Sequence, residues 1–300
     1  CYSDRERKRR RHQPRLWDAS LMDDLPRCDY DQVMTDDSSR LKLFEQVRDL
    51  GFSIMHGAPA TPGALERVGS SFGHLERTDI LGRITDLYTS PEKVFITDTP
   101  LPIPKHTDYC YRHAPSGIQF FQGVKTSGGG GESVFGDGFK IAAVLRKAEP
   151  EAFDLLSRIP LQFYRYTKDK NAYYSEGLAI SLNQWGEVVG FRYANRVTAA
   201  PLDLPEKLVG PIHDALRKLV TFMNDPGLEV RHLLEPGDIV IFDNQRVLHG
   251  RTAYDDNQGE RHIRRCQVAR EDFHSRLRLL MIEFDRPEPR NLVLGHGALA

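Results

Sequence analysis

A histidine and a carboxylate lie two residues apart in the segment 104–109. If this segment is extended, its period of two places His106 and Asp108 on one face and Thr107 on the other. An imidazole and a carboxylate so placed can bind one metal ion. The chain has 11 histidines, so the pair alone is weak evidence. A second His-x-acid pattern, at 74–76, ends an expected helix, where residues two apart do not share a face, and we interpret it as structural.

A histidine far along the chain is the candidate third ligand. Residues 236–238 predict a turn, 239–242 an apolar strand, 243–246 a second turn and 247–250 the returning strand. His249 therefore lies on a strand that we expect to be buried, and Gly250 leaves space for a ligand near the backbone. Two histidines and one carboxylate form the facial triad that suits non-haem Fe(II). The alternative is that His249 is a hydrogen-bonded core histidine.

Arginines downstream of His249 could bind an anionic cosubstrate. An iron oxygenase that takes electrons from 2-oxoglutarate must hold that molecule's far carboxylate, a task that suits the bidentate guanidinium of arginine. Arg261 and Arg265 follow His249 by 12 and 16 residues and would share one strand face with Ile263. Either arginine could serve. The alternative is a basic cluster on the surface.

Hydrophobic periodicity predicts the elements that position these residues. Helical spacing predicts helices over 41–50, ended by Gly51, and over 61–72, where Thr61-Pro62 looks like a cap followed by a first-turn proline. Further helical patterns lie at 138–157, 205–223 and 271–284, and strand-like runs at 94–97, 118–124, 239–242 and 266–269. Many short strands with a few outer helices indicate a mainly β fold with flanking helices, a double-stranded β-helix (jelly-roll) barrel.

Composition and charge exclude several classes of protein. The 300 residues, 40% hydrophobic and 28% charged, are typical of a globular chain, and the net charge of −1 argues against a nucleic-acid binder. No apolar run could span a membrane. Four widely spaced cysteines favour a reducing, cytoplasmic setting. We interpret residues 1–30, with the basic run 5–11, as an arm or linker and 31–300 as the catalytic domain.

Four strings resemble one known family. They are HTDYCYRHAPSGIQF (106–120), GGGGESVFGDGF (128–139), EPGDIVIFDNQRVLHGR (235–251) and ERHIRRCQVAREDFHSRLR (260–278). Together they look like the γ-butyrobetaine hydroxylases and, more broadly, the taurine-dioxygenase-like Fe(II)/2-oxoglutarate oxygenases. The resemblance covers about residues 90–280. It suggests a homodimer and a small zinc-binding N-terminal domain, which we expect this chain to lack.

The resemblance implies roles for individual residues. It implies that Fe(II) is bound by His106, Asp108 and His249, with 2-oxoglutarate and O₂ as cosubstrates. Arg261 matches the residue that binds the 2-oxoglutarate C5 carboxylate in the γ-butyrobetaine branch, and Ser133 a hydroxyl residue beside that carboxylate. Arg265 matches the corresponding arginine of the taurine branch, so both arginines remain candidates. The carboxylate at position 108, which related halogenases lack, favours hydroxylation, desaturation or ring closure.

The resemblance fails at the substrate pocket. The family's aromatic cage for a trimethylammonium group would fall at four positions, none of them aromatic here: Leu81, Thr85, Asp98 and Gln267. In the string FRYANR (191–196), Arg192 and Tyr193 occupy positions where substrate contacts are expected, and Tyr109 could line the same pocket. Asp98 could pair with an amine and Arg192 with a carboxylate. This pattern predicts a small substrate bearing both groups.

Four functions follow, in decreasing order of preference. The first is hydroxylation of a small amine- and carboxylate-bearing metabolite. The second is hydroxylation of γ-butyrobetaine or a related betaine. The third is oxidation of a protein side chain, with residues 5–11 helping to dock the partner. The last is a catalytically silent metal-binding jelly roll, which the intact set of expected ligands disfavours.

Overall fold

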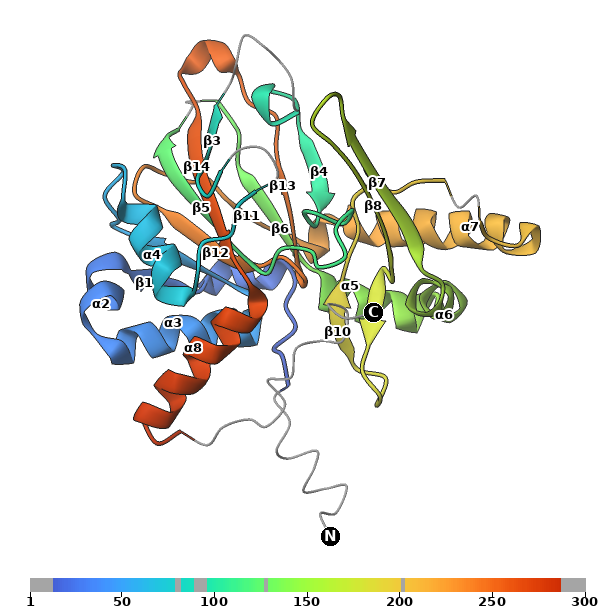
Figure 1. The fold of residues 1–300 in the computed structure, drawn as a ribbon, viewed down its shortest axis with the longest axis horizontal. Helices are drawn as coiled ribbons and strands as arrows, with labels where there is room; N and C mark the ends of the chain where they lie inside the picture. Colours follow the sequence, from blue (N-terminus) through green and yellow to red (C-terminus); the bar gives the residue numbers. More distant parts are fainter. Residues whose placement is uncertain (1–12, 79–81, 89–95, 127–128, 201–202, 287–300) are drawn as a thin grey trace.

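The fold is built around two β-sheets that face each other (Figure 1). The computed structural model describes residues 13–78, 82–88, 96–126, 129–200 and 203–286. The larger sheet has six strands, in the order β1 (Arg27–Asp29), β2 (Phe52–His56), β12 (Ile239–Asp243), β5 (Ile118–Lys125), β14 (His262–Val268) and β3 (Thr85–Tyr88). The smaller has four, in the order β11 (Val230–His232), β6 (Ser133–Asp137), β13 (Val247–Arg251) and β4 (Ile103–His106).

Apolar side chains from both sheets meet between them. The Phe135 ring of β6 lies 5.8 Å from that of Phe52 and 5.9 Å from that of Phe242, both on the larger sheet. Strands β12 and β5 pair antiparallel with Ile241 opposite Phe120, so the apolar runs predicted at 239–242 and 118–124 form the centre of this sheet. The mainly β, double-stranded β-helix prediction is confirmed. Within the described residues the two sheets remain separate and do not close into a barrel.

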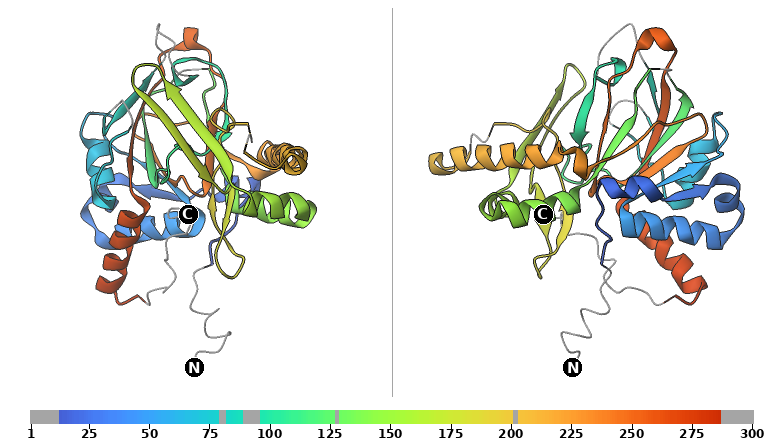
Figure 2. Two further views of the ribbon diagram at one scale, coloured as in Figure 1. Left: turned by 45° about the vertical axis from the view of Figure 1, so that its right-hand side comes forward. Right: turned by 180° about the vertical axis from the view of Figure 1, so that it is seen from behind.

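Helices cover the outer face of each sheet (Figure 2). Aromatic residues of three helices, Phe44, Phe72 and Phe273, pack against the larger sheet. The helices on this side are α2 (Tyr30–Thr35), α3 (Asp37–Leu50), α4 (Ala64–Phe72) and α8 (Arg270–Glu283). A second core lies beyond the smaller sheet, and its elements are α5 (Gly138–Ala148), α6 (Pro150–Arg158), α7 (Glu206–Met223), the hairpin β7 (Leu161–Thr167)–β8 (Asn171–Gly177), and the pair β9 (Ile180–Leu182)–β10 (Val188–Phe191).

Some predicted boundaries differ from the structure for local reasons. Helix α4 begins after Gly63, whose backbone N–H donates to Glu66, so Thr61-Pro62 precedes the helix instead of capping it. The helical pattern over 138–157 is two helices, because Pro150 begins α6. The strand predicted at 94–97 is wrong where it can be tested, since η2 (Ile96–Asp98) is a 3₁₀ turn. Residues 94 and 95 lie outside the described residues.

The described part of the predicted arm, residues 13–30, packs against the rest of the fold. The 3₁₀ segment η1 (Ala19–Asp24) buries Leu21, and Trp17 Nε1 donates to the Leu50 carbonyl at 2.7 Å. Strand β1 adds to the larger sheet beside β2. The predicted boundary at residue 30 therefore falls inside a packed region, while the basic run 5–11 lies outside the described residues. None of the described helices combines the length and apolarity that a membrane crossing needs.

Candidate active site

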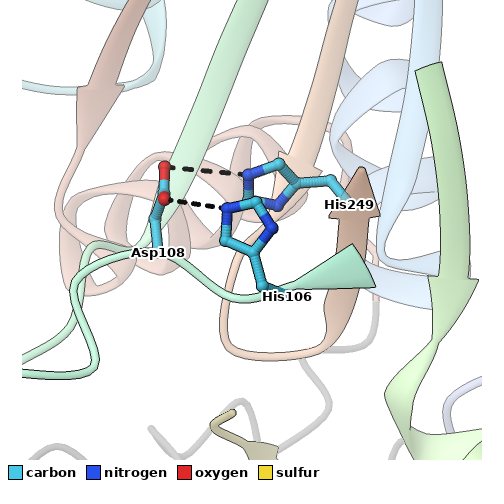
Figure 3. A group of neighbouring side chains, drawn as sticks. All are labelled: His106, Asp108 and His249. Carbon is cyan, nitrogen blue, oxygen red and sulfur yellow. Dashed lines mark ion pairs between the residues drawn. The ribbon is translucent and has the colours of Figure 1, made fainter. Parts of the chain in front are cut away.

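Two adjacent strands and the turn after one of them bring the predicted metal ligands together (Figure 3). Strands β4 and β13 pair antiparallel with His106 directly opposite His249. Asp108 follows the end of β4 by two residues, and its two carboxylate oxygens lie 3.3 Å from His106 Nε2 and 3.7 Å from His249 Nε2. One ligand atom from each of the three residues lies within 4.8 Å of the other two.

Backbone and amide contacts hold the ligands in this orientation. His106 Nδ1 lies 2.8 Å from the Pro104 carbonyl, which can only accept, so Nδ1 carries the proton and Nε2 keeps its lone pair. The Asp108 N–H donates to Asn244 Oδ1 at 2.7 Å, and Asn244 Nδ2 returns a bond to the Asp108 carbonyl. The Thr107 hydroxyl accepts from the Tyr193 N–H at 3.0 Å, which ties the segment between the two ligands to the chain after β10.

The charges of the three ligands suit a cation. Burial alone would raise the pKa of Asp108, but contacts with the two imidazoles and the positive charge of Arg265 lower it well below its usual value. Burial, and then the neighbouring His106, lowers the pKa of His249 to about 4, so its imidazole is neutral at pH 7. The site thus presents an ionised carboxylate and a neutral His249 imidazole beside His106.

This donor set fits a ferrous ion. His106 Nε2 lies 3.3 Å from one oxygen of the ionised Asp108 carboxylate, close enough for both atoms to bind the same ion. The 3.7 Å separation of His249 Nε2 from Asp108 is too long for a hydrogen bond and leaves room for a shared ligand. Two imidazoles and one carboxylate are the set that non-haem Fe(II) prefers when positions must remain open for other ligands.

The three ligands lie in the wall of a cavity of about 740 Å³. Arg261, Ile263 and Arg265 all line this cavity, as expected if they share one strand face. Strand β14 begins only at His262, however, and its register has a bulge between His262 and Ile263. Ser133, at the start of β6, and Tyr109 also line the cavity. The aromatic rings of Phe121 and Phe242 lie against His249, at 5.5 and 4.9 Å between centroids, and limit the access of water to that ligand.

The two candidate arginines differ in what they contact. Arg265 donates from Nη1 to Asp108 Oδ2 and from Nη2 to the Tyr109 hydroxyl, both at 2.8 Å. Arg261 lies over the Tyr254 ring, 5.8 Å from its centroid, and has no hydrogen bond or ion pair within the described part of the chain. Burial lowers the pKa of Arg261 to about 10, so it remains charged at neutral pH. Arg261 is therefore the arginine that is available to a ligand.

Comparison with known proteins identifies the family. The family described as "Taurine catabolism dioxygenase TauD, TfdA family" matches residues 10–267. The chain belongs to this family. A γ-butyrobetaine dioxygenase from Pseudomonas sp. (strain AK-1) is 33% identical over 276 residues, which are 92% of this chain and 70% of that protein. The trimethyllysine dioxygenase of Rattus norvegicus is 30% identical over 89% of this chain and 64% of its own length.

Solved structures at low sequence identity show the same fold. An asparagine oxygenase in complex with Fe(II), 3-hydroxyasparagine and succinate has a TM-score of 0.61 at 14% identity, over 80% of this chain and 83% of that one. A taurine dioxygenase from Burkholderia xenovorans has a TM-score of 0.57 at 16% identity, over 75% and 80%. Family membership and the His-Asp-His site make this chain an Fe(II)- and 2-oxoglutarate-dependent dioxygenase, as the sequence predicted.

Four predicted substrate residues of this TauD/TfdA-family dioxygenase are not among the described residues that line the cavity. Arg192 donates to the carbonyls of Cys110 and Arg112 and to the Ser175 hydroxyl, so its guanidinium supports a buried loop. The Tyr193 side chain packs in the core beside α7. Gln267 Nε2 donates to Glu76, and Asp98 lies in η2. Tyr109 alone of the five predicted substrate residues lines the cavity.

Other cavity residues were not predicted. Arg165 comes from β7, Arg251 from β13 and Arg196 from the segment after β10. Arg196 ends the same FRYANR string in which Arg192 was singled out. The string predicted an arginine near the substrate. Because Arg192 and Arg196 are four residues apart, an extended segment would place both on one face, so the pattern does not tell which of the two contacts the substrate. Of the former cage positions, Thr85 is buried in β3 and Leu81 lies outside the described residues.

Proposed function

We propose that this dioxygenase hydroxylates a small metabolite that bears an amine and a carboxylate. The convergence of His106, Asp108 and His249 on one cavity wall carries this proposal. A cavity of about 740 Å³ is of the size that holds small ligands, here a cosubstrate and a small substrate. Relatives named for γ-butyrobetaine and trimethyllysine, both small amines, support the substrate class.

Arg261 and Ser133 would hold the far carboxylate of 2-oxoglutarate. Both residues line the cavity, and Gly131, two residues before Ser133, lies directly beside the Arg261 side chain. A charged guanidinium with no carboxylate partner among the described residues gains most from an anionic ligand. Arg265, which bonds to Asp108, would instead hold that metal ligand in its ionised form.

The protein supplies orientation to this chemistry. Iron, when bound, couples the decarboxylation of 2-oxoglutarate to the activation of O₂. His106, Asp108 and His249 fix three positions around the ion, and Asn244 holds the Asp108 backbone so that its carboxylate faces both imidazoles. The substrate is then held so that one C–H bond faces the metal, which is the contribution of positioning to the rate.

The assignment is tested by the visible charge-transfer band that Fe(II) and 2-oxoglutarate form together under anaerobic conditions. We expect the wild-type chain to show the band and His106→Ala to abolish it. His74→Ala is the matched control, because His74 has the same His-x-acid pattern but a fully exposed side chain. A band that survives in His106→Ala would remove the site assignment.

Hydroxylation of γ-butyrobetaine is the second candidate, favoured by the 33% identical relative. We expect γ-butyrobetaine to be a poor substrate, because the matched cage positions are not aromatic. Succinate release coupled to hydroxylated γ-butyrobetaine, at rates typical of a dedicated enzyme, would establish this candidate instead. A cytoplasmic setting, a homodimer and oxidation of a protein side chain stay predictions from the sequence.

A further inference from the structure

The cavity carries more positive charge than iron and 2-oxoglutarate require. Among the described residues, its wall contains one carboxylate, Asp108, and six basic side chains: Arg165, Lys168, Arg196, Arg251, Arg261 and Arg265. Arg265 pairs with Asp108, and Arg251 donates to the carbonyls of Thr99 and Leu101. With Arg261 assigned to 2-oxoglutarate, Arg196 is left without an ion-pair partner among the described residues, and Arg165 and Lys168, whatever their own contacts, add positive charge on the same side of the cavity, formed by β7 and the segment after β10.

Arg196 is the cation of this group that lies nearest to the metal ligands. Its Nη2 is 3.4 Å from His106 Nε2, and its side chain is accessible to a ligand within the cavity. Among the described residues no carboxylate lies within ion-pair distance of it. Its charged neighbours are Asp108, which already forms an ion pair with Arg265, and Arg165, whose positive charge repels that of Arg196. An added anion would therefore relieve repulsion between Arg196 and Arg165.

Two of the aromatic rings that line the cavity already contact arginines of the protein itself. The Arg165 guanidinium lies 5.3 Å from the centre of the Tyr111 ring, while Arg112 and Arg265 lie 5.3 and 5.7 Å from that of Tyr109. These are the positions that a ligand's ammonium group would need for cation–π attraction. A quaternary ammonium group at the Tyr109 or Tyr111 ring would therefore meet positive charge, whereas the rings of Tyr164 and Tyr166, which also line the cavity, are exposed.

We propose that Arg196, together with Arg165, forms a second anion site that binds the acid group of the substrate. This inference rests on the proposed function and deepens it, because it names the substrate's anchoring group and moves the expected anion contact from Arg192 to Arg196. The ligand class is a small organic acid, carboxylate or sulfonate. A bidentate guanidinium suits either acid.

The experiment compares acids with their uncharged amides. The probes are 3-aminopropanoate, 4-aminobutanoate, 5-aminopentanoate and 6-aminohexanoate, each with the matching amide, titrated into the anaerobic Fe(II)–2-oxoglutarate complex. Dissociation constants come from the shift of the charge-transfer band and from calorimetry. We expect at least one acid to bind about tenfold more tightly than its amide, the effect typical of one charge-assisted hydrogen bond. Equal binding of every acid and its amide, or no binding of either, would overturn the proposal.

Substitutions assign the effect to a residue. Arg196→Gln is expected to remove the preference for the acid while changing the dissociation constant of 2-oxoglutarate less than twofold, and Arg196→Lys to keep part of the preference. Arg158→Gln, in an exposed ion pair on α6, is the control and should behave as wild type. If Arg196→Gln weakens 2-oxoglutarate instead, Arg196 binds the cosubstrate and the inference is wrong. A missing band in the wild type would be the separate failure of the proposed function.

Discussion

At the scale of single residues, the carboxylate of Asp108 joins the metal site to its charged surroundings. Its Oδ2 accepts hydrogen bonds from Arg265 at 2.8 Å and from Gln119 at 3.2 Å. The imidazoles lie beside the same carboxylate, His106 Nε2 at 3.3 Å from Oδ1 and His249 Nε2 at 3.7 Å from Oδ2. A buried carboxylate remains ionised only when such partners outweigh the loss of water. The sequence left Arg265 and Arg261 as candidates for the cosubstrate, and in the structure the Arg265 guanidinium donates to Asp108 and lowers its pKa.

Replacement of Arg265 by glutamine should make metal binding more sensitive to acid. The Arg265 charge lowers the pKa of Asp108, so its removal lets burial raise that pKa, and protons then compete with the metal at higher pH. We expect the acid limb of the Fe(II)-binding profile, measured anaerobically between pH 5 and 8, to move to higher pH. Arg264→Gln is the matched control, since Arg264 pairs with Glu66 and Asp86 outside the cavity. Superimposable profiles for Arg265→Gln and wild type would refute the role of Arg265.

Replacement of Arg261 should affect 2-oxoglutarate and not the metal. Loss of a charge-assisted bidentate contact typically weakens an anionic ligand by about 10- to 100-fold. We therefore expect Arg261→Gln to raise the dissociation constant of 2-oxoglutarate by that factor with little change in Fe(II) affinity. Titration of both ligands into the variant measures the two effects separately. If Arg265→Gln shows the larger loss of 2-oxoglutarate affinity, the assignment of the two arginines must be exchanged.

At the scale of elements, the close approach of β4 to β13 sets the distance between the two histidines. A Cβ atom at Gly250 would lie 2.5 Å from the Ile103 carbonyl oxygen and 3.0 Å from the Lys105 nitrogen, both backbone atoms of β4. The sequence suggested that this glycine leaves room for a ligand. The structure shows that it also leaves room for the neighbouring strand, which carries His106.

Gly250→Ala should therefore damage both stability and the metal site. The added methyl group would push β4 away from β13, at a cost of about 1–3 kcal/mol typical of overpacking, and would separate His106 from His249. Urea unfolding and Fe(II) titration measure the two effects. Gly210→Ala in α7 is the control, because a Cβ there meets nothing within 4 Å and an alanine favours the helix. Unchanged Fe(II) affinity in Gly250→Ala would show that this packing does not position the ligands.

Elements with strong periodicity could be predicted from sequence, and short irregular ones could not. Five elements lie where their apolar periodicity predicted them: helices α3, α7 and α8 and strands β5 and β12. In each of them the spacing of the apolar residues matches one type of element and one buried face. The 94–97 run is apolar but short, and it carries no alternation that separates a strand from a 3₁₀ turn. Its conformation depends on tertiary contacts that no local pattern encodes.

At the scale of the whole molecule, the metal ligands could be predicted but the substrate contacts could not. The ligands are fixed by the spacing of His106 and Asp108 and by a turn that returns His249, which are local features. The choice between Arg192 and Arg196 depends on the carbonyls of Cys110 and Arg112, about 80 residues earlier in the chain. These carbonyls accept hydrogen bonds from Arg192, whereas Arg196 lines the cavity. The excess of positive charge likewise appears only when separate strands and loops meet.

One buried ion pair connects the N-terminal segment to both sheets and to α5. Arg246 follows β12 and donates to Asp137 Oδ1 and Oδ2 at 3.1 and 3.0 Å, and to the carbonyls of Arg15 and Asp49. Asp137 ends β6, accepts from the Trp17 N–H and caps α5. Both ionic side chains are almost completely inaccessible, at 2% and 0% exposure. Loss of this ion pair should therefore lower the stability of the whole fold.

Arg246→Met should destabilise the whole domain, because it leaves the Asp137 carboxylate buried without its cation. Removal of one partner of a buried pair typically costs about 3–5 kcal/mol. Lys140→Met is the matched control: Lys140 pairs with Asp18 in the same region, but both side chains are about one-third exposed, so the loss should be below about 1 kcal/mol. Urea unfolding curves give both values, and limited proteolysis should cut Arg246→Met first within residues 13–24, which the pair holds against the sheets. Equal losses in the two variants would mean that the buried pair does not anchor the N-terminal segment and that apolar packing around Trp17 does so instead.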